Sequence, residues 1–137
     1  NGDSSAYNML LPTSSEIRGP FGHSKVQIEN EIDEIWITFP DPQIKYKRSK
    51  HRLTHPDFLK NYKEILKPKG IVHLKTDSEF LFGYTLGMLA NQGAILYAHH
   101  DIYNNSSSPQ VATAIQTFYE KQFLREGKAI TYMQFTL

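Results

Sequence analysis

The sequence predicts an α/β fold with a mostly parallel sheet and flanking helices. Short runs of branched and aromatic residues alternate with segments of helical period, which is typical of βαβ units. The first run, at 35–39, is continuously apolar, as expected of a parallel strand covered on both faces. Turn and capping residues separate the segments, and right-handed crossovers would then place helices on both faces of an open sheet.

The first strand and the helix after it have clear boundaries. Pro40 and Pro42 lack the amide hydrogen that a sheet requires, so the strand must end before them. Thr54 and Pro56 mark the start of a helix, because apolar residues then recur at helical spacing. The residues at 67–70 end that helix.

The rest of the chain continues the same alternation. A second strand at 71–74 runs into Lys75, Thr76 and Asp77, and Asp77 or Ser78 can cap a second helix. The remaining expected elements are a helix end near 91–93, a strand at 94–99, a polar loop at 101–109, a helix at about 110–125 and a final strand at 130–137.

Length and composition indicate one domain. The 137 residues suffice for a single core, with residues 1–30 an irregular segment of uncertain role and 31–137 the domain proper. The hydrophobic share of 39% is that of a globular chain, and no apolar stretch approaches the roughly 20 residues that span a bilayer. No signal peptide is recognisable and cysteine is absent, so we expect a cytoplasmic protein without membrane association.

Charge is concentrated locally, although the formal net charge is only +1. The one dense cationic run contains Lys45, Lys47, Arg48, Lys50, His51 and Arg52. Such a run would attract phosphates and release counterions from a nucleic acid, and Tyr46 within it could stack on a base. The alternative is a solvated surface loop, because most runs of charged residues are simply exposed to solvent.

Two aspartates follow the first two strands of the predicted sheet. Asp41 and Asp77 both lie at strand carboxyl ends, where open α/β sheets bind ligands. If the strands are neighbours, these carboxylates face one crevice. The prolines around Asp41 would hold its carboxylate ready for a positive or electron-poor ligand. The Pro-Asp-Pro stretch is also compatible with a simple turn.

Other kinds of site are disfavoured. His99 and His100 are adjacent in a strand and should point to opposite faces, so they are not expected to share a metal ion. His73 lies in a strand that looks buried and is interpreted as a core histidine with satisfied hydrogen bonds. There is neither a glycine-rich phosphate loop nor a G-x-S-x-G nucleophile elbow. We therefore predict no metal.

Three motifs occur in order along the chain: "EIDEIWITFPDPQIKYKRSKHRL", "FLKNYKEILKPKGIVHLKTDSEFLFGY" and "IQTFYEKQFLREGKAI". They combine FPDP with a basic RL segment, LKPKG with K-T-D, and T-x-Y-E with a closing F-x-x-x-G. In this order and spacing they closely resemble the bacterial tRNA (guanine-N7-)-methyltransferase family over about residues 31–137. The resemblance implies a Rossmann-like S-adenosylmethionine-dependent methyltransferase fold, of which this chain looks like the second half.

The resemblance also implies an activity and its residues. The reaction would be methylation of N7 of a guanine in the tRNA variable loop, with S-adenosylmethionine as methyl donor. Asp41 would be the catalytic carboxylate beside the donor. Substrate contacts would come from Lys45, Asp77, Thr117, Phe118, Tyr119 and Glu120. The tRNA backbone would follow Lys47, Arg48, Ser49, Lys50, His51 and Arg52.

The chain departs from the family pattern in two places. Family members usually have Trp after the second proline, where this chain has Gln43. The acidic, glycine-rich cofactor motif of the family's first strand does not occur before residue 31, so we expect weak or absent S-adenosylmethionine binding by this chain alone, which as a fragment can be inactive.

Two alternatives to the tRNA enzyme stay open at this point. One is a noncatalytic RNA-binding module on a partial Rossmann-like fold, and the other is a methyltransferase with a different substrate. An exposed sheet edge would also favour association between copies.

Overall fold

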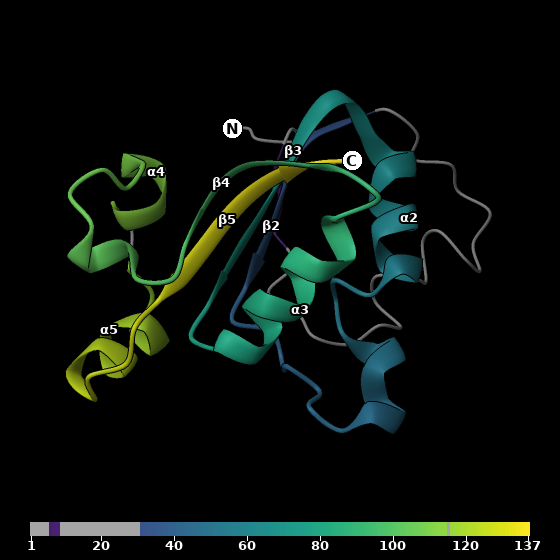
Figure 1. The fold of residues 1–137 in the computed structure, drawn as a ribbon. Helices are drawn as coiled ribbons and strands as arrows, with labels where there is room; N and C mark the ends of the chain where they lie inside the picture. Colours follow the sequence, from purple (N-terminus) through teal and green to yellow (C-terminus); the bar gives the residue numbers. More distant parts are fainter. Residues whose placement is uncertain (1–5, 9–30, 115) are drawn as a thin grey trace.

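The computed structural model describes residues 6–8, 31–114 and 116–137, and a five-stranded sheet runs through them (Figure 1). The strands are β1 (Ala6–Asn8), β2 (Ile32–Thr38), β3 (Leu66–Thr76), β4 (Ala94–His99) and β5 (Thr131–Thr136). Their order is β1-β2-β3-β5-β4, with β1, β2 and β3 parallel and β5 antiparallel to both of its neighbours. The predicted α/β fold with a mostly parallel sheet is confirmed.

Strand β2 shows why this sequence forms a central strand. Ile35 and Ile37 are fully buried on one face, whereas Trp36 packs into a second apolar cluster on the other face. Alternating side chains therefore serve two cores at once. The strand ends at Thr38, just before Pro40, as the missing amide hydrogen requires.

Two helices cover one face of the sheet, α2 (Pro56–Ile65) and α3 (Glu79–Leu89) (Figure 1). Both begin with a side-chain cap: His55 accepts a hydrogen bond from the amide of Asp57, and Ser78 accepts one from the amide of Leu81. Their apolar side chains join the larger core, which contains Phe58, Leu59, Tyr62, Ile65, Leu81 and Leu89 with Val72, Leu74, Met133 and Phe135 of the sheet.

The opposite face carries a smaller cluster, formed by Ile102, Ala112, Ile130 and Tyr132. Ile102 belongs to η3 (Ile102–Asn104) and Ala112 to α4 (Gln110–Thr113), and residues of α5 (Phe118–Arg125) pack against the cluster. In Figure 1, α4 and α5 lie on the other side of the sheet from α2 and α3. The prediction of helices on both faces is therefore confirmed.

The single helix expected at about 110–125 is wrong, because the segment forms α4 and α5 separately. The break has a local cause at Thr117. Its backbone is extended, with φ −73° and ψ 169°, and its hydroxyl accepts a hydrogen bond from the amide of Glu120. Threonine competes well for such a cap and is a weaker helix former inside a helix, so a new helix starts here.

The residues at 67–70 do end the first long helix, but they belong to β3 and not to a connecting turn. Ile32 pairs with Leu66 and Glu34 with Ile71, so the chain of β3 makes a bulge between the two pairs. Lys69 accommodates the bulge with a φ of 69°.

The irregular segment expected at 1–30 lies outside the described residues except for β1. At the other edge of the sheet β4 exposes Ile95 and Leu96. Association between copies through an edge stays a prediction. In the described part of the chain, no helix has the length and apolarity needed to cross a bilayer.

Candidate active site

The carboxyl ends of β2 and β3 lie side by side. Thr38 is in register with Lys75, and the amide of Phe39 donates to the Lys75 carbonyl at 2.7 Å. Asp77 follows the end of β3 directly, and Asp41 comes three residues after the end of β2. The strands β2 and β3 are thus neighbours, which is the condition that the sequence analysis set for a shared crevice, and both aspartates lie at the edge of the sheet where α/β proteins bind ligands.

The turn that carries Asp41 is tightly specified. Its Oδ1 accepts a hydrogen bond from the amide of Gln43 at 3.0 Å, which is the turn geometry that aspartate favours. Phe39 and Gln43 have φ values of 50° and 48°, in the left-handed region that side chains other than glycine rarely adopt. Strained backbone of this kind often lies at functional sites, so the stretch is both a turn and a candidate site.

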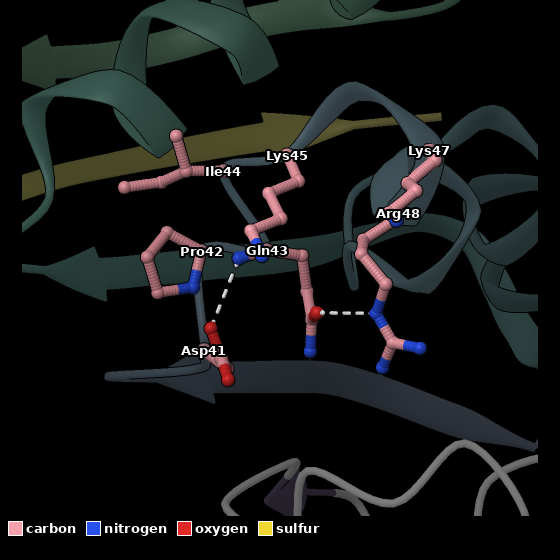
Figure 2. Close-up of a pocket in the computed structure, with 7 residues that line it drawn as sticks. All are labelled: Asp41, Pro42, Gln43, Ile44, Lys45, Lys47 and Arg48. Carbon is pink, nitrogen blue, oxygen red and sulfur yellow. Dashed lines mark hydrogen bonds between the residues drawn. The ribbon is translucent and has the colours of Figure 1, made fainter.

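Asp41 lines an open pocket of about 400 Å³. The other lining residues are Pro42, Gln43, Ile44, Lys45, Lys47 and Arg48 (Figure 2). The pocket thus combines an exposed carboxylate with three cationic side chains. An electron-poor group near Asp41 and a phosphate near the cations could occupy it together.

Most of the basic run forms a short 3-10 helix, η2 (Tyr46–His51), whose residues carry no acidic side chain. Tyr46 is 89% exposed, and Lys45, Lys47, Arg48 and Lys50 are exposed as well. Arg48 Nε donates to the side-chain oxygen of Gln43 at 3.3 Å, which connects η2 to the Asp41 turn (Figure 2). The run is an exposed cationic surface, as both sequence interpretations require.

Arg52 is the exception among these cations, because it is only 6% exposed. Its guanidinium donates to the carbonyls of Gln43 and Ile44 and lies against the rings of Phe80 and Tyr84. Burial raises the pKa of Tyr84, and the neighbouring Arg52 opposes that shift. The guanidinium is therefore engaged inside the protein.

A buried ionic group lies at the end of β3. Lys75 Nζ is 2.8 Å from Glu120 Oε2, and both side chains are almost fully inaccessible to solvent. Tyr103 donates its hydroxyl hydrogen to the same carboxylate oxygen, and burial together with this bond raises the pKa of Tyr103. Within the described part of the chain, the other oxygen, Glu120 Oε1, is buried without a hydrogen-bond partner. A buried polar atom without a partner is uncommon in native proteins.

The other residues of the T-x-Y-E motif divide by exposure. Thr117 caps α5, whereas Phe118 and Tyr119 are 71% and 63% exposed. Asp77 forms an ion pair with Lys128 at 3.5 Å. The structure thus brings Asp77 and Glu120 to the end of β3, and Asp41 to the end of the adjacent strand.

Sequence reasoning gave no role to the Lys75 side chain or to Tyr103. Lys75 offered a signal, since a lysine in a strand of otherwise buried residues must find an anionic partner. Tyr103 offered none, because it belongs to a polar loop whose path depends on the whole fold.

His73 is a core histidine, as predicted. Its Nε2 lies 2.7 Å from Glu34 Oε1, and its Nδ1 lies 2.7 Å from the Tyr132 hydroxyl. A carboxylate can only accept, so Nε2 carries the hydrogen and Nδ1 accepts from Tyr132. The ring also stacks on Trp36 at 3.8 Å between centroids. Desolvation lowers the pKa of His73, against the opposing effect of Glu34.

His99 and His100 do not point to opposite faces, as strand alternation predicted. Their rings stack 4.8 Å apart at 14°, because His100 lies beyond the end of β4. His99 Nδ1 accepts from the amide of Asp101. Over residues 6–8, 31–114 and 116–137, no three His, Cys, Asp or Glu side chains form a group that could hold a metal ion.

Comparison with known proteins defines the family. A family model described as "Putative methyltransferase" matches residues 24–133. The chain belongs to this methyltransferase family. The match includes both strand ends, the basic run and the buried Lys75–Glu120 pair.

Curated relatives match most of this chain. It is 67% identical over 109 residues to the tRNA (guanine-N(7)-)-methyltransferase of Christiangramia forsetii, and the alignment covers 79% of this chain and 49% of that protein. The protein of the same name from Bacteroides thetaiotaomicron is 44% identical over 108 residues, with 78% and 42% covered. The chain spans about half the length of the curated relatives it matches.

Proposed function

We propose that the protein methylates N7 of a guanine in the variable loop of tRNA, with S-adenosylmethionine as the methyl donor. One observation carries the proposal: in a chain of a methyltransferase family, Asp41 lines the same pocket as three cations of the basic run, Lys45, Lys47 and Arg48, at the carboxyl end of the sheet. The names of the curated relatives support tRNA and guanine N7 as the target.

The residues of the pocket can contact a positively charged methyl donor from one side. Asp41 is exposed, lines the pocket and is held in place by the Gln43 amide. S-adenosylmethionine, when bound, supplies a methyl group whose bond to sulfur breaks as the bond to guanine N7 forms. Guanine N7 has a lone pair and no proton, so the chain need supply no general base. Asp41 would orient the reacting groups and stabilise the positive charge that passes to the base.

The exposed cations of the basic run would hold the RNA. Lys47, Arg48 and Lys50 can each neutralise a phosphate, and Lys45, which also lines the pocket, lies between them and Asp41 in the sequence. Ser49 and His51 lie on the same short helix. Tyr46, at 89% exposure, is available to stack on a base.

The end of β3 would contribute the remaining substrate contacts. Asp77 and Glu120 are carboxylates near that end. A guanine presents N–H donors on its Watson–Crick edge, which the partly exposed carboxylate of Asp77 suits, whereas Glu120 is fully buried and would meet the base only after a rearrangement of the protein. Phe118 and Tyr119 offer exposed rings at the start of α5.

The substitution Asp41→Asn tests the catalytic role with little change in shape. Asparagine can keep the hydrogen bond from the Gln43 amide and loses only the charge. In the full gene product, we expect the methylation rate at saturating tRNA to fall at least about tenfold, because one electrostatic contact to developing charge is lost. The matched control is Asp57→Asn, at an exposed position on α2.

Two results would decide against the proposal. An unchanged rate in Asp41→Asn would remove Asp41 from the reaction. Binding of tRNA by a wild-type protein that transfers no methyl group would favour the noncatalytic RNA-binding module.

A further inference from the structure

Arg52 belongs to the basic run in sequence but not in structure. Its side chain is buried, whereas Arg48 and Lys50 are exposed. A guanidinium that is 6% exposed cannot meet a phosphate unless it first leaves its present partners. The guanidinium of Arg52 therefore interacts with groups of the protein itself.

The guanidinium of Arg52 is bonded to the backbone beside Asp41. Nε donates to the carbonyl of Gln43 at 3.0 Å, and Nη2 donates to the carbonyl of Ile44 at 3.1 Å. These carbonyls lie two and three residues after Asp41 and directly before Lys45. A planar fork of donors can hold both at once, which a lysine ammonium on a flexible stem cannot reproduce.

The same guanidinium is fixed from the other side by α3. Its Cζ lies 4.8 Å from the ring centre of Phe80 and 4.6 Å from that of Tyr84. These cation–π contacts are strengthened by burial. Helix α3 begins immediately after Asp77 and Ser78, so Arg52 connects the segments that carry the two aspartates.

We propose that Arg52 is a positioning residue for methyl transfer: it holds the turn at 41–45 against α3 and so fixes the Asp41 carboxylate and Lys45. The inference rests on the proposed function for its catalytic consequence. Gln43 adopts a left-handed φ of 48°, and a strained turn of this kind persists only where its surroundings hold it. Arg52 provides that restraint.

The test compares Arg52→Lys with Arg125→Lys in the full gene product. Both keep a positive charge, but Arg125 is exposed on α5. Three quantities are measured: the rate at saturating tRNA, the dissociation constant for tRNA as a function of salt, and hydrogen exchange of the Gln43 amide. That amide is bonded to Asp41, so its exchange reports on the turn independently of activity.

For Arg52→Lys we expect the rate to fall at least about tenfold, since small misplacements of reacting groups are costly. The dissociation constant and its salt dependence should stay within about twofold, because no phosphate contact is lost. The Gln43 amide should exchange several-fold faster. Arg125→Lys should change none of the three.

A second variant guards against loss of the fold. Phe80→Leu removes one ring from the guanidinium at a position that is 42% exposed, and it should also speed exchange of the Gln43 amide, by a smaller factor.

Opposite outcomes would overturn the inference. Weaker tRNA binding with a reduced salt slope and an unchanged saturated rate would make Arg52 a phosphate contact. Unchanged Gln43 exchange in both variants would show that Arg52 does not hold the turn. If the wild-type protein transfers no methyl group, the proposed function fails, and the exchange measurement alone then decides whether Arg52 fixes the turn.

Discussion

The buried pair Lys75–Glu120 should be essential for stability. The two charges are 2.8 Å apart, with side-chain exposures of 5% and 0%. Lys75→Met would keep most of the side-chain volume but leave a carboxylate in the interior without this cation. Removal of one member of a buried pair typically costs about 3–5 kcal/mol, because the other charge stays desolvated. That is a large part of the roughly 5–15 kcal/mol that stabilises a domain.

Urea denaturation of the wild type, Lys75→Met, Glu120→Gln and the double variant would measure the effect. Each single variant should lose about 3 kcal/mol or more, and the double variant should lose less than the sum by at least about 2 kcal/mol. The control is Lys128→Met, because Lys128 is half-exposed and its pair with Asp77 should contribute less than about 1 kcal/mol. A loss below about 1 kcal/mol in Lys75→Met, or strict additivity, would refute the reasoning.

Three further outcomes are expected. A Cβ at Gly93 would lie 2.2 Å from the Thr136 carbonyl oxygen, so Gly93→Ala should cost about 2 kcal/mol in urea denaturation, whereas Gly87→Ala, with open space around it, should be neutral or stabilising. The pKa of His73 is lowered in the folded state, so the unfolded state binds this proton at a higher pH than the folded state does. The free energy of unfolding should therefore decrease as the pH is lowered below 6.5, by at most about 1.4 kcal/mol per pH unit. His73→Gln should reduce this pH dependence in melting experiments, and an equal pH dependence in wild type and variant would contradict the reasoning. Lys47→Ala should weaken tRNA binding. The slope of the logarithm of the binding constant against the logarithm of the salt concentration should decrease in magnitude by about one, and an unchanged slope would exclude a phosphate contact at Lys47.

The sequence predicted most of the elements because their signals are local. Strand β4 was predicted at 94–99, where the structure has it, and α2 begins at the predicted Pro56. Thr117 was one exception, since an apolar stripe on both of its sides was interpreted as one helix. The competing preference of Thr117 for a cap decided the outcome.

Only those site residues that lie at strand ends could be placed from the sequence. Asp41 and Asp77 could be placed from the strand pattern, and β2 and β3 are indeed neighbours. Burial could not be read from the run of charges, so Arg52 and Lys47 looked equivalent in sequence. What distinguishes them is the position of α3, whose rings cover Arg52 and no other cation of the run among the described residues. That arrangement is a tertiary property.

The most direct test of the proposed function is methyl transfer to a tRNA in which the variable-loop guanine is replaced by 7-deazaguanine. This base keeps the Watson–Crick edge of guanine and lacks only the N7 lone pair. With labelled S-adenosylmethionine and the full gene product, unmodified tRNA should gain one methyl group at that guanine, and the 7-deaza tRNA should bind equally well and gain none. Equal methylation of the two RNAs, or methylation of neither, would contradict the account.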